Sequence, residues 1–271
     1  EQHRGVNNQL PLIQALEELG LAVITKEELQ FFQNLHPSTF VFQISTQEAR
    51  ELISPYMAYT KSQLGQDLFA LAASKTSSPG YFVEFGATDG VSLSNTWLLE
   101  QKLGWTGILA EPAKAWHSRL KANRNCIIDT RCVSNTTGEI VKFLEVNQSG
   151  EGSPVLSGLK EFADNGDWAS KIRQEESIEY SVETVTLECL LNEHEAPEEI
   201  QFLSIDTEGS EFNIIKDFNF QRRKINAICI EHNYVEENRK AINALLTSNG
   251  YHQIAKGLTK WDDWYILGRG Q

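Results

Sequence analysis

The sequence changes its apolar period at Tyr81, and this change restricts the fold more than any other feature. From there, short apolar runs alternate with amphipathic stretches; the runs are YFVEF, GILAE, CIID, IQFLSID and INAICIEH. The runs have the length of buried strands, whereas stretches such as NTWLLEQKL and EENRKAINALL place apolar residues at helical spacing. This alternation predicts an α/β fold in which a mostly parallel sheet carries helices on both faces. The runs GYHQIAKG and WYILG predict two strands that close the sheet.

The chain before Tyr81 follows a helical pattern only. Apolar residues recur at helical spacing from Leu12 to Leu19, and the pattern continues near 26–35, 46–58 and 62–74. We expect residues 1–60 to form an N-terminal helical extension and residues 61–271 to form the main domain.

Two segments interrupt the alternation of strands and helices. In VSNTTGEIVKFLEV, a Thr-Thr-Gly turn between alternating residues predicts a hairpin or an edge pair. The segment at about 147–177 is rich in glycine and has few apolar repeats. A long irregular insertion in a compact domain is either a lid over a functional site or a loose surface loop. We expect a lid-like insertion, with the surface loop as the alternative.

The charge balance and the apolar runs exclude several classes of function. The chain carries 24 Lys and Arg against 37 Asp and Glu, and its net charge of −13 repels a nucleic-acid backbone. No apolar run approaches the roughly 18 residues that a membrane span needs. The four cysteines show no zinc-ligand or redox spacing. The first residues, EQHRGVNNQL, lack the pattern of a secretory leader, so we expect a soluble cytoplasmic protein.

The turn after the first strand, in YFVEFGATDGVSLSNT, carries two glycines and two acids. A dinucleotide site uses G-x-G-x-x-G to bring backbone N–H groups to a pyrophosphate, whereas Gly86 and Gly90 here form G-x-x-x-G. The carboxylates of Glu84 and Asp89 repel phosphate and attract the ammonium and sulfonium groups of S-adenosylmethionine. The turn therefore predicts an S-adenosylmethionine site and makes an NAD-dependent oxidoreductase the weaker alternative. Capping of a helix is the other interpretation of Glu84 or Asp89.

The second strand, GWTGILAEP, ends in Glu111 about one strand–helix–strand step after Gly86. An acid at the carboxyl end of such a strand accepts hydrogen bonds from both ribose hydroxyls of a nucleoside. Pro112 then ends the strand. Glu111 is thus expected to bind the ribose of the same cofactor.

The order and spacing of these blocks resemble the FkbM family of S-adenosylmethionine-dependent methyltransferases over residues 62 to 268. The resemblance is carried by SQLGQD, FVEFGATDG, SLSNTWLLE, GWTGILAEP, LSIDTEGSE and EHNY. It implies a class I methyltransferase sheet, which is Rossmann-like and mostly parallel, with one antiparallel strand near the C-terminal edge. It also implies methyl transfer to an oxygen atom.

The resemblance assigns roles to single residues. It implies that Glu84, Gly86 and Asp89 hold the methionine part of the cofactor and that Asn95 lies close to them. Gln66 is expected to approach the cofactor from the preceding helix, and Ser134 to lie beside the adenine. The complete expected cofactor set is Gln66, Glu84, Gly86, Asp89, Gly90, Asn95, Glu111, Pro112 and Ser134.

A second group of acids follows the strand IQFLSID. Asp206, Glu208 and Glu211 lie within six residues around a glycine and repel one another unless a positive group lies among them. Capping of the next helix is the alternative for Glu208 and Glu211. Asp206 and Glu231 end neighbouring predicted strands, at the edge where open α/β sheets bind ligands.

Methyl transfer to an alcohol needs a group that removes the hydroxyl proton or lowers its pKa. His232 is the imidazole beside this edge and is the leading candidate for the general base, with Asp206 or Glu231 orienting it. The catalytic set is completed by Glu208. Alternatively, Asp206, Glu231 and His232 bind a divalent metal that acidifies the acceptor hydroxyl. Trp261 and Trp264 are expected to pack the edge of the sheet.

These observations predict an O-methyltransferase that acts on a hydroxyl of a sugar, glycan or related natural product. The lid-like insertion is expected to close over this acceptor. The alternative from another class is a domain that binds S-adenosylmethionine, or a protein partner, without turnover. The crowding of acids at one edge favours the enzyme, because a binding module has no need of it.

Overall fold

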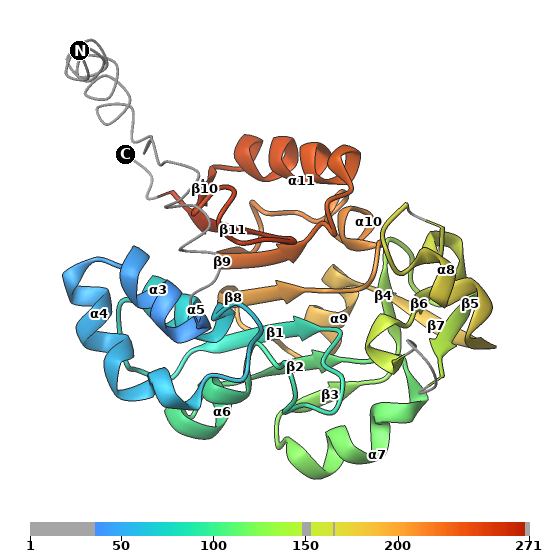
Figure 1. The fold of residues 1–271 in the computed structure, drawn as a ribbon, viewed down its shortest axis with the longest axis horizontal. Helices are drawn as coiled ribbons and strands as arrows, with labels where there is room; N and C mark the ends of the chain where they lie inside the picture. Colours follow the sequence, from blue (N-terminus) through green and yellow to red (C-terminus); the bar gives the residue numbers. More distant parts are fainter. Residues whose placement is uncertain (1–35, 148–152, 165, 269–271) are drawn as a thin grey trace, which may run out of the picture. The chain divides into compact units, whose positions relative to one another are not determined.

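The computed structural model describes residues 36–147, 153–164 and 166–268 (Figure 1). The helical patterns expected at 12–19 and 26–35 lie outside these residues. The chain from His36 onward forms one compact unit by its contacts. Within the described residues, no helix has both the length and the apolar character that a membrane crossing requires.

The main sheet has seven strands in the order β10-β11-β9-β8-β1-β2-β3. All neighbouring pairs are parallel except those of β11, which lies antiparallel between β9 and β10. The predicted mostly parallel sheet, with an antiparallel strand near its C-terminal edge, is therefore confirmed. Its strands are β1 (Tyr81–Phe85), β2 (Thr106–Ala110), β3 (Ile127–Asp129), β8 (Glu199–Ile205), β9 (Lys224–Glu231), β10 (Tyr251–Ile254) and β11 (Asp262–Leu267).

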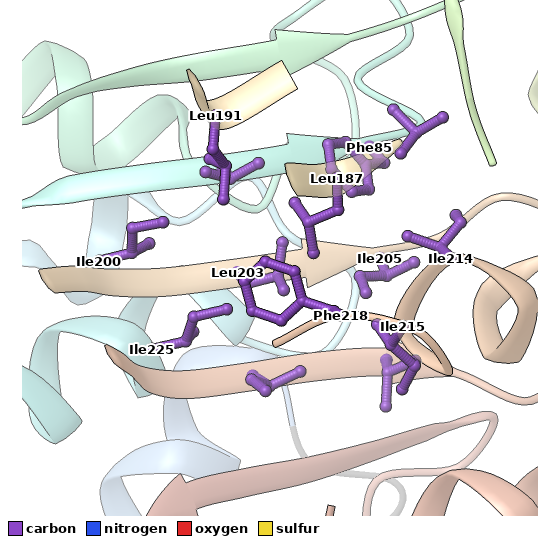
Figure 2. Close-up of a cluster of buried hydrophobic side chains, with 14 of the residues drawn as sticks. Phe85, Leu187, Leu191, Ile200, Leu203, Ile205, Ile214, Ile215, Phe218 and Ile225 are labelled. Carbon is purple, nitrogen blue, oxygen red and sulfur yellow. The ribbon is translucent and has the colours of Figure 1, made fainter. Parts of the chain in front are cut away.

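The central strands are almost continuously apolar because helices cover both faces of the sheet. Side chains alternate between the two faces along each strand. On one face, a large buried cluster joins the sheet to the short helices α9 (Leu187–Glu193) and α10 (Glu211–Ile215) and to α11 (Glu236–Ser248). Figure 2 shows Leu203 and Ile205 of β8 pointing toward Leu187, Ile214 and Phe218 in this cluster.

The opposite face is packed by aromatic rings. The Phe69 ring, on α5 (Gln66–Ser74), stacks on Trp264 of β11 with 4.8 Å between centroids and meets Phe202 of β8 edge-on. Phe40, on α3 (Pro37–Ile44), contacts Trp264 at 5.9 Å. Trp264 was expected at the edge of the sheet, and it packs one face of β11, the neighbour of the edge strand β10.

The predicted helices at 46–58 and 62–74 are present as α4 (Gln47–Ile53), the 3-10 helix η1 (Ser54–Tyr59) and α5. The strands β1, β2 and β3 are connected through α6 (Trp97–Leu103) and α7 (Lys114–Asn123). The proposed division of the chain at residue 60 stays a prediction.

A second sheet of four strands has the order β4-β7-β5-β6. Its strands are β4 (Cys132–Ser134), β5 (Ile140–Val146), β6 (Gly158–Leu159) and β7 (Ser177–Thr186). The predicted hairpin or edge pair of β4 with β5 is wrong, because β7 lies between them and pairs with both. The ten-residue β7 is long enough to pair with β5 over seven positions and with β4 beyond them. Local alternation in the sequence does not reveal so distant a partner.

The insertion at 147–177 contains short elements where it is described. These are η2 (Pro154–Leu156), β6, η3 (Lys160–Phe162) and α8 (Ser170–Glu175). Leu156, Ala169 and Ile172 are buried against Val146 of β5. A small apolar cluster of its own therefore fixes the described part of the insertion to the second sheet.

Gly86 joins the end of β1 to the end of β8 at close range. It has φ +76°, and a Cβ atom there would lie 2.0 Å from the Asp206 carbonyl oxygen. Gly138 has a similar φ of +81°, but a Cβ atom there would meet nothing within 4 Å. A side chain at Gly138 would therefore meet only the cost of a left-handed backbone, whereas one at Gly86 would also collide with the Asp206 carbonyl oxygen.

We expect Gly86→Ala to lower the free energy of unfolding by more than about 2 kcal/mol, because the β1–β8 contact must open. Gly138→Ala is the matched control and should cost only about 1–2 kcal/mol, the penalty of the left-handed backbone alone. Urea denaturation of both variants measures the difference. Equal losses would show that the close approach at Gly86 is not a constraint.

Candidate active site

The carboxyl ends of β1, β2, β8 and β9 surround a cavity of about 340 Å³. This volume lies within the range of about 300–1,000 Å³ that small-molecule sites have. Ligands of open α/β sheets bind at this edge. Besides the strand ends, the insertion contributes Ser153–Leu156 and Trp168, and the loops beside β9 and β11 contribute Tyr234 and Trp261.

Backbone strain is concentrated around this cavity. Nine described residues other than glycine have a positive φ, and five of them line the cavity. Asn233 and Tyr234 are consecutive, with φ values of +44° and +61°. Such conformations cost free energy and are retained mainly where a site requires them. The five residues are Thr88, Leu93, Glu208, Asn233 and Tyr234.

Glu84 is buried in the cavity wall and organises the loop after β1. Its carboxylate accepts hydrogen bonds from the Asn95 N–H at 2.7 Å and from the hydroxyls of Ser94 and Thr96. The Arg124 guanidinium lies 3.8 Å behind it. Burial raises the pKa of Glu84, while Arg124 lowers it. The chain itself therefore satisfies much of this carboxylate.

Glu111 also lines the cavity, directly after β2. One oxygen accepts a hydrogen bond from the Thr88 N–H and the other from the Ala113 N–H, each at 2.8 Å. Burial raises the pKa of Glu111 to about 7, against the lowering effect of these two bonds. The two bonds fix the carboxylate at the cavity wall.

Asp206, Glu208 and Glu231 each place a carboxylate oxygen within 4.8 Å of the others. The Asn233 side-chain amide donates to Glu231 at 2.8 Å and to Glu208 at 3.3 Å. Burial raises the pKa of Asp206 to about 7 and raises those of Glu208 and Glu231 as well. These three acids form the carboxylate cluster. Glu211 is not part of it, since its carboxylate accepts the N–H groups of Thr207 and Gly209 at the start of α10.

Arg173, on α8 of the insertion, connects the insertion to the carboxylate cluster. Its guanidinium is buried and donates to Glu208 at 2.8 Å, and it also pairs with Asp167. Nothing in the local sequence marks Arg173 for this contact, because Glu208 lies 35 positions away. The ion pair was therefore missed by the sequence analysis.

Of the predicted site residues, Glu84, Gly86, Asn95, Glu111, Pro112, Asp206, Glu208 and Glu231 line the cavity. The structure places five others away from its wall. Gln66 donates to Asp262 at 2.8 Å, and Asp89 accepts the N–H groups of Val91 and Ser92 in its own turn. Gly90 accepts a hydrogen bond from Arg124, and the Ser134 hydroxyl donates to Asn135.

His232 is the fifth of these residues. Its Nδ1 accepts a hydrogen bond from the Tyr234 N–H at 3.0 Å, and its Nε2 lies 3.6 Å from Asp263. The predicted metal-binding set was Asp206, Glu231 and His232, but the third residue that lies beside Asp206 and Glu231 is Glu208. His232 follows the end of β9, and it does not line the cavity, whereas Glu231 does. Its predicted catalytic role stays a prediction.

Several cavity residues were missed by the sequence analysis, among them Asn233, Tyr234 and Trp168. Asn233 and Tyr234 belong to the block EHNY, which was a usable signal, whereas Trp168 lies in a segment without a pattern. Trp261 was expected to pack the sheet edge but lines the cavity.

A model of the methyltransferase FkbM domain matches residues 84–252, which is more than half of the chain. The chain therefore belongs to this family. A comparison with curated proteins gives no significant match. Among solved structures, a methyltransferase FkbM from Methylobacillus flagellatus KT is similar, with a TM-score of 0.46 and 11% sequence identity. The match covers 96% of this chain and 59% of that protein.

The raised pKa of Asp206 makes stability depend on pH. The unfolded chain loses this proton near pH 4, whereas the folded protein keeps it up to about pH 7. The folded state thus binds more protons between these limits, and the free energy of unfolding falls as the pH rises through that window.

We expect Asp206→Asn, which has no proton to lose, to melt at a higher temperature than the wild type. The difference should grow from pH 4 to pH 7 and then level off. Calorimetry across this range tests the expectation, with exposed Asp217→Asn as the control. A difference independent of pH would show that burial of Asp206 is not the cause.

Proposed function

We propose that this chain transfers a methyl group from S-adenosylmethionine to a hydroxyl oxygen of a small acceptor. The observation that carries the proposal is the buried Glu111 at the end of β2, in one cavity with the carboxylate cluster. The antiparallel β11 between β9 and β10 supports assigning the main sheet to the class I methyltransferases.

The described residues fit this cofactor on two counts. Each oxygen of Glu111 accepts one backbone N–H and has a second lone pair, so the carboxylate has room for two ribose hydroxyls. Asn95 is buried in the cavity wall, and its Oδ1 has no hydrogen-bond donor among the described residues. An acceptor left without a donor indicates a bound group that supplies one. The ammonium of the methionine part is such a donor.

The electrostatics of the cavity favour a cationic cofactor. Five acids line it, and none of the described lining residues is Lys, Arg or His. A carboxylate in a site of low polarity attracts a cation more strongly than it does in water. The acids are Glu84, Glu111, Asp206, Glu208 and Glu231.

S-adenosylmethionine, when bound, supplies a methyl group on a positively charged sulfur. The work of the chain is to align the acceptor hydroxyl and to remove its proton. We assign the removal of this proton to Asp206. Its carboxylate lines the cavity, and its pKa of about 7 suits a general base near neutral pH. Hydrogen bonding with Glu231 lowers this pKa against the effect of burial. His232 remains the competing candidate predicted from the sequence.

The carboxylate cluster also fits a divalent metal, with Glu208 replacing His232 in the predicted ligand set. Carboxylate oxygens are the ligands that magnesium and calcium prefer. Arg173 already donates to Glu208, so a metal must share this carboxylate with a guanidinium. We therefore give the metal second place.

We expect the purified chain to bind S-adenosylhomocysteine, and Glu111→Gln to weaken this binding about 10-fold or more, the cost of losing charge-assisted hydrogen bonds. Exposed Glu193→Gln is the control and should bind like the wild type. Isothermal titration, with NAD in parallel, measures these affinities. Binding of NAD alone would replace the proposal with the oxidoreductase.

The base is tested by turnover with a panel of glycosides, phenols and long-chain alcohols. Asp206→Asn should lower kcat by about 100-fold or more while S-adenosylhomocysteine still binds. His232→Gln should keep most of the turnover. The opposite pattern would establish His232 as the base, and loss of turnover with a chelator, restored by magnesium, would establish the metal. Cofactor binding without turnover by any acceptor would favour the non-catalytic domain.

A further inference from the structure

Exposed apolar side chains gather at the mouth of the cavity. Seven large hydrophobic residues are exposed among the described residues, and three of them line the cavity: Leu93, Trp168 and Tyr234. The exposed fractions of Trp168 and Tyr234 are 69% and 64%. Aromatic rings left exposed to water beside a cavity indicate a binding surface.

Trp168 is exposed, yet its backbone is held firmly. The preceding Asp167 accepts hydrogen bonds from the Ala169 N–H at 2.9 Å and from the Ser170 hydroxyl at 3.1 Å. Asp167 also pairs with the buried Arg173, which in turn pairs with Glu208 of the carboxylate cluster. The ring of Trp168 is therefore presented from a fixed position, although its side chain packs little against the protein.

Tyr234 is held in a comparable way in the turn that follows β9. Its backbone has φ +61°, and its N–H donates to the His232 ring, which also contacts the Tyr234 ring at 5.7 Å between centroids. This strained and anchored conformation leaves most of the phenol ring exposed. Two unrelated segments thus each use a fixed backbone to expose an aromatic ring at one cavity.

The charge of the cavity limits what these rings can bind. Its described lining carries five acids and no basic side chain, so a phosphate or carboxylate near the reacting hydroxyl is repelled. Trp261 also lines the cavity, but the Lys260 ammonium lies 5.5 Å from the centroid of its ring. Because a cation of the chain already contacts this ring, we do not include it with Trp168 and Tyr234. Carboxylates are acceptors only, and they accept hydrogen bonds from hydroxyl groups.

We propose that Trp168 and Tyr234 form the acceptor subsite and that it takes an uncharged polyhydroxylated ring, such as a pyranoside. The apolar C–H face of the ring lies on the aromatic side chains, while its hydroxyls donate to the acids deeper in the cavity. This proposal rests on the proposed function, because it names the class of acceptor for the same site. An anionic ring is excluded by charge, and an open-chain polyol lacks the flat face.

The test is saturation-transfer NMR with three probes in the presence of S-adenosylhomocysteine. The probes are methyl β-D-glucopyranoside, the corresponding glucuronide with a carboxylate at C6, and sorbitol. We expect saturation of the glucopyranoside and none of the other two. Trp168→Ala and Tyr234→Ala should each weaken its binding about 2- to 12-fold, the contribution of one aromatic contact.

Trp168→Phe, which keeps a ring, should retain most of the binding and guards against a variant that fails to fold. Ile140→Ala is the matched control, because Ile140 is equally exposed at 69% but does not line the cavity. Equal saturation of the glucuronide, binding unaffected by both alanine variants, or no glucopyranoside signal would each overturn the proposal. Titration with S-adenosylhomocysteine distinguishes the failures, since cofactor binding without glycoside binding rejects the subsite alone.

Discussion

Five carboxylates share one cavity at the carboxyl edge of the sheet, and much of the surrounding structure compensates for their burial. An ionised acid inside a protein is costly unless hydrogen bonds or opposite charges satisfy it. Arg124 stands behind Glu84, two backbone N–H groups hold Glu111, and Asn233 bridges Glu208 and Glu231. Burial nevertheless raises the pKa of Asp206 to about 7, and it raises those of Glu208 and Glu231 as well. The part of this cost that is left uncompensated favours a cationic ligand in the cavity.

The insertion between β5 and β7 takes part in the same compensation. Arg173 supplies a buried positive charge to Glu208, and Gly158 of β6 would place a Cβ atom 3.3 Å from the Glu208 Cβ. The position of the insertion and the state of the carboxylate cluster are therefore coupled by charge and by close packing. An insertion attached in this way shapes the cavity wall and places a positive charge beside the carboxylate cluster.

Much of the fold was predictable because its strands and helices have distinct apolar periods. The seven strands of the main sheet, including the antiparallel β11, follow the runs read from the sequence. The second sheet was not predictable in the same way. Its strand β7 pairs with β4 and β5 across 30 or more intervening residues, and no local pattern encodes that choice. Asn95 and Glu111 reached the cavity as expected, whereas Asp89 and Gly90 serve the turn itself.

The sequence by itself determined the class of fold, the family and the gathering of acids at one edge. Parallel strands bring their carboxyl ends together, so residues such as Asp206 and Glu231 meet wherever such a sheet forms. Only the tertiary structure decided that Glu208, and not His232, lies beside Asp206 and Glu231. It also decided that Trp168 lines the cavity. The directions of these side chains depend on left-handed backbone at Glu208, Asn233 and Tyr234 and on a buried ion pair from a distant helix. No periodicity or spacing in the sequence predicts these backbone conformations or this ion pair, because packing between remote segments selects them.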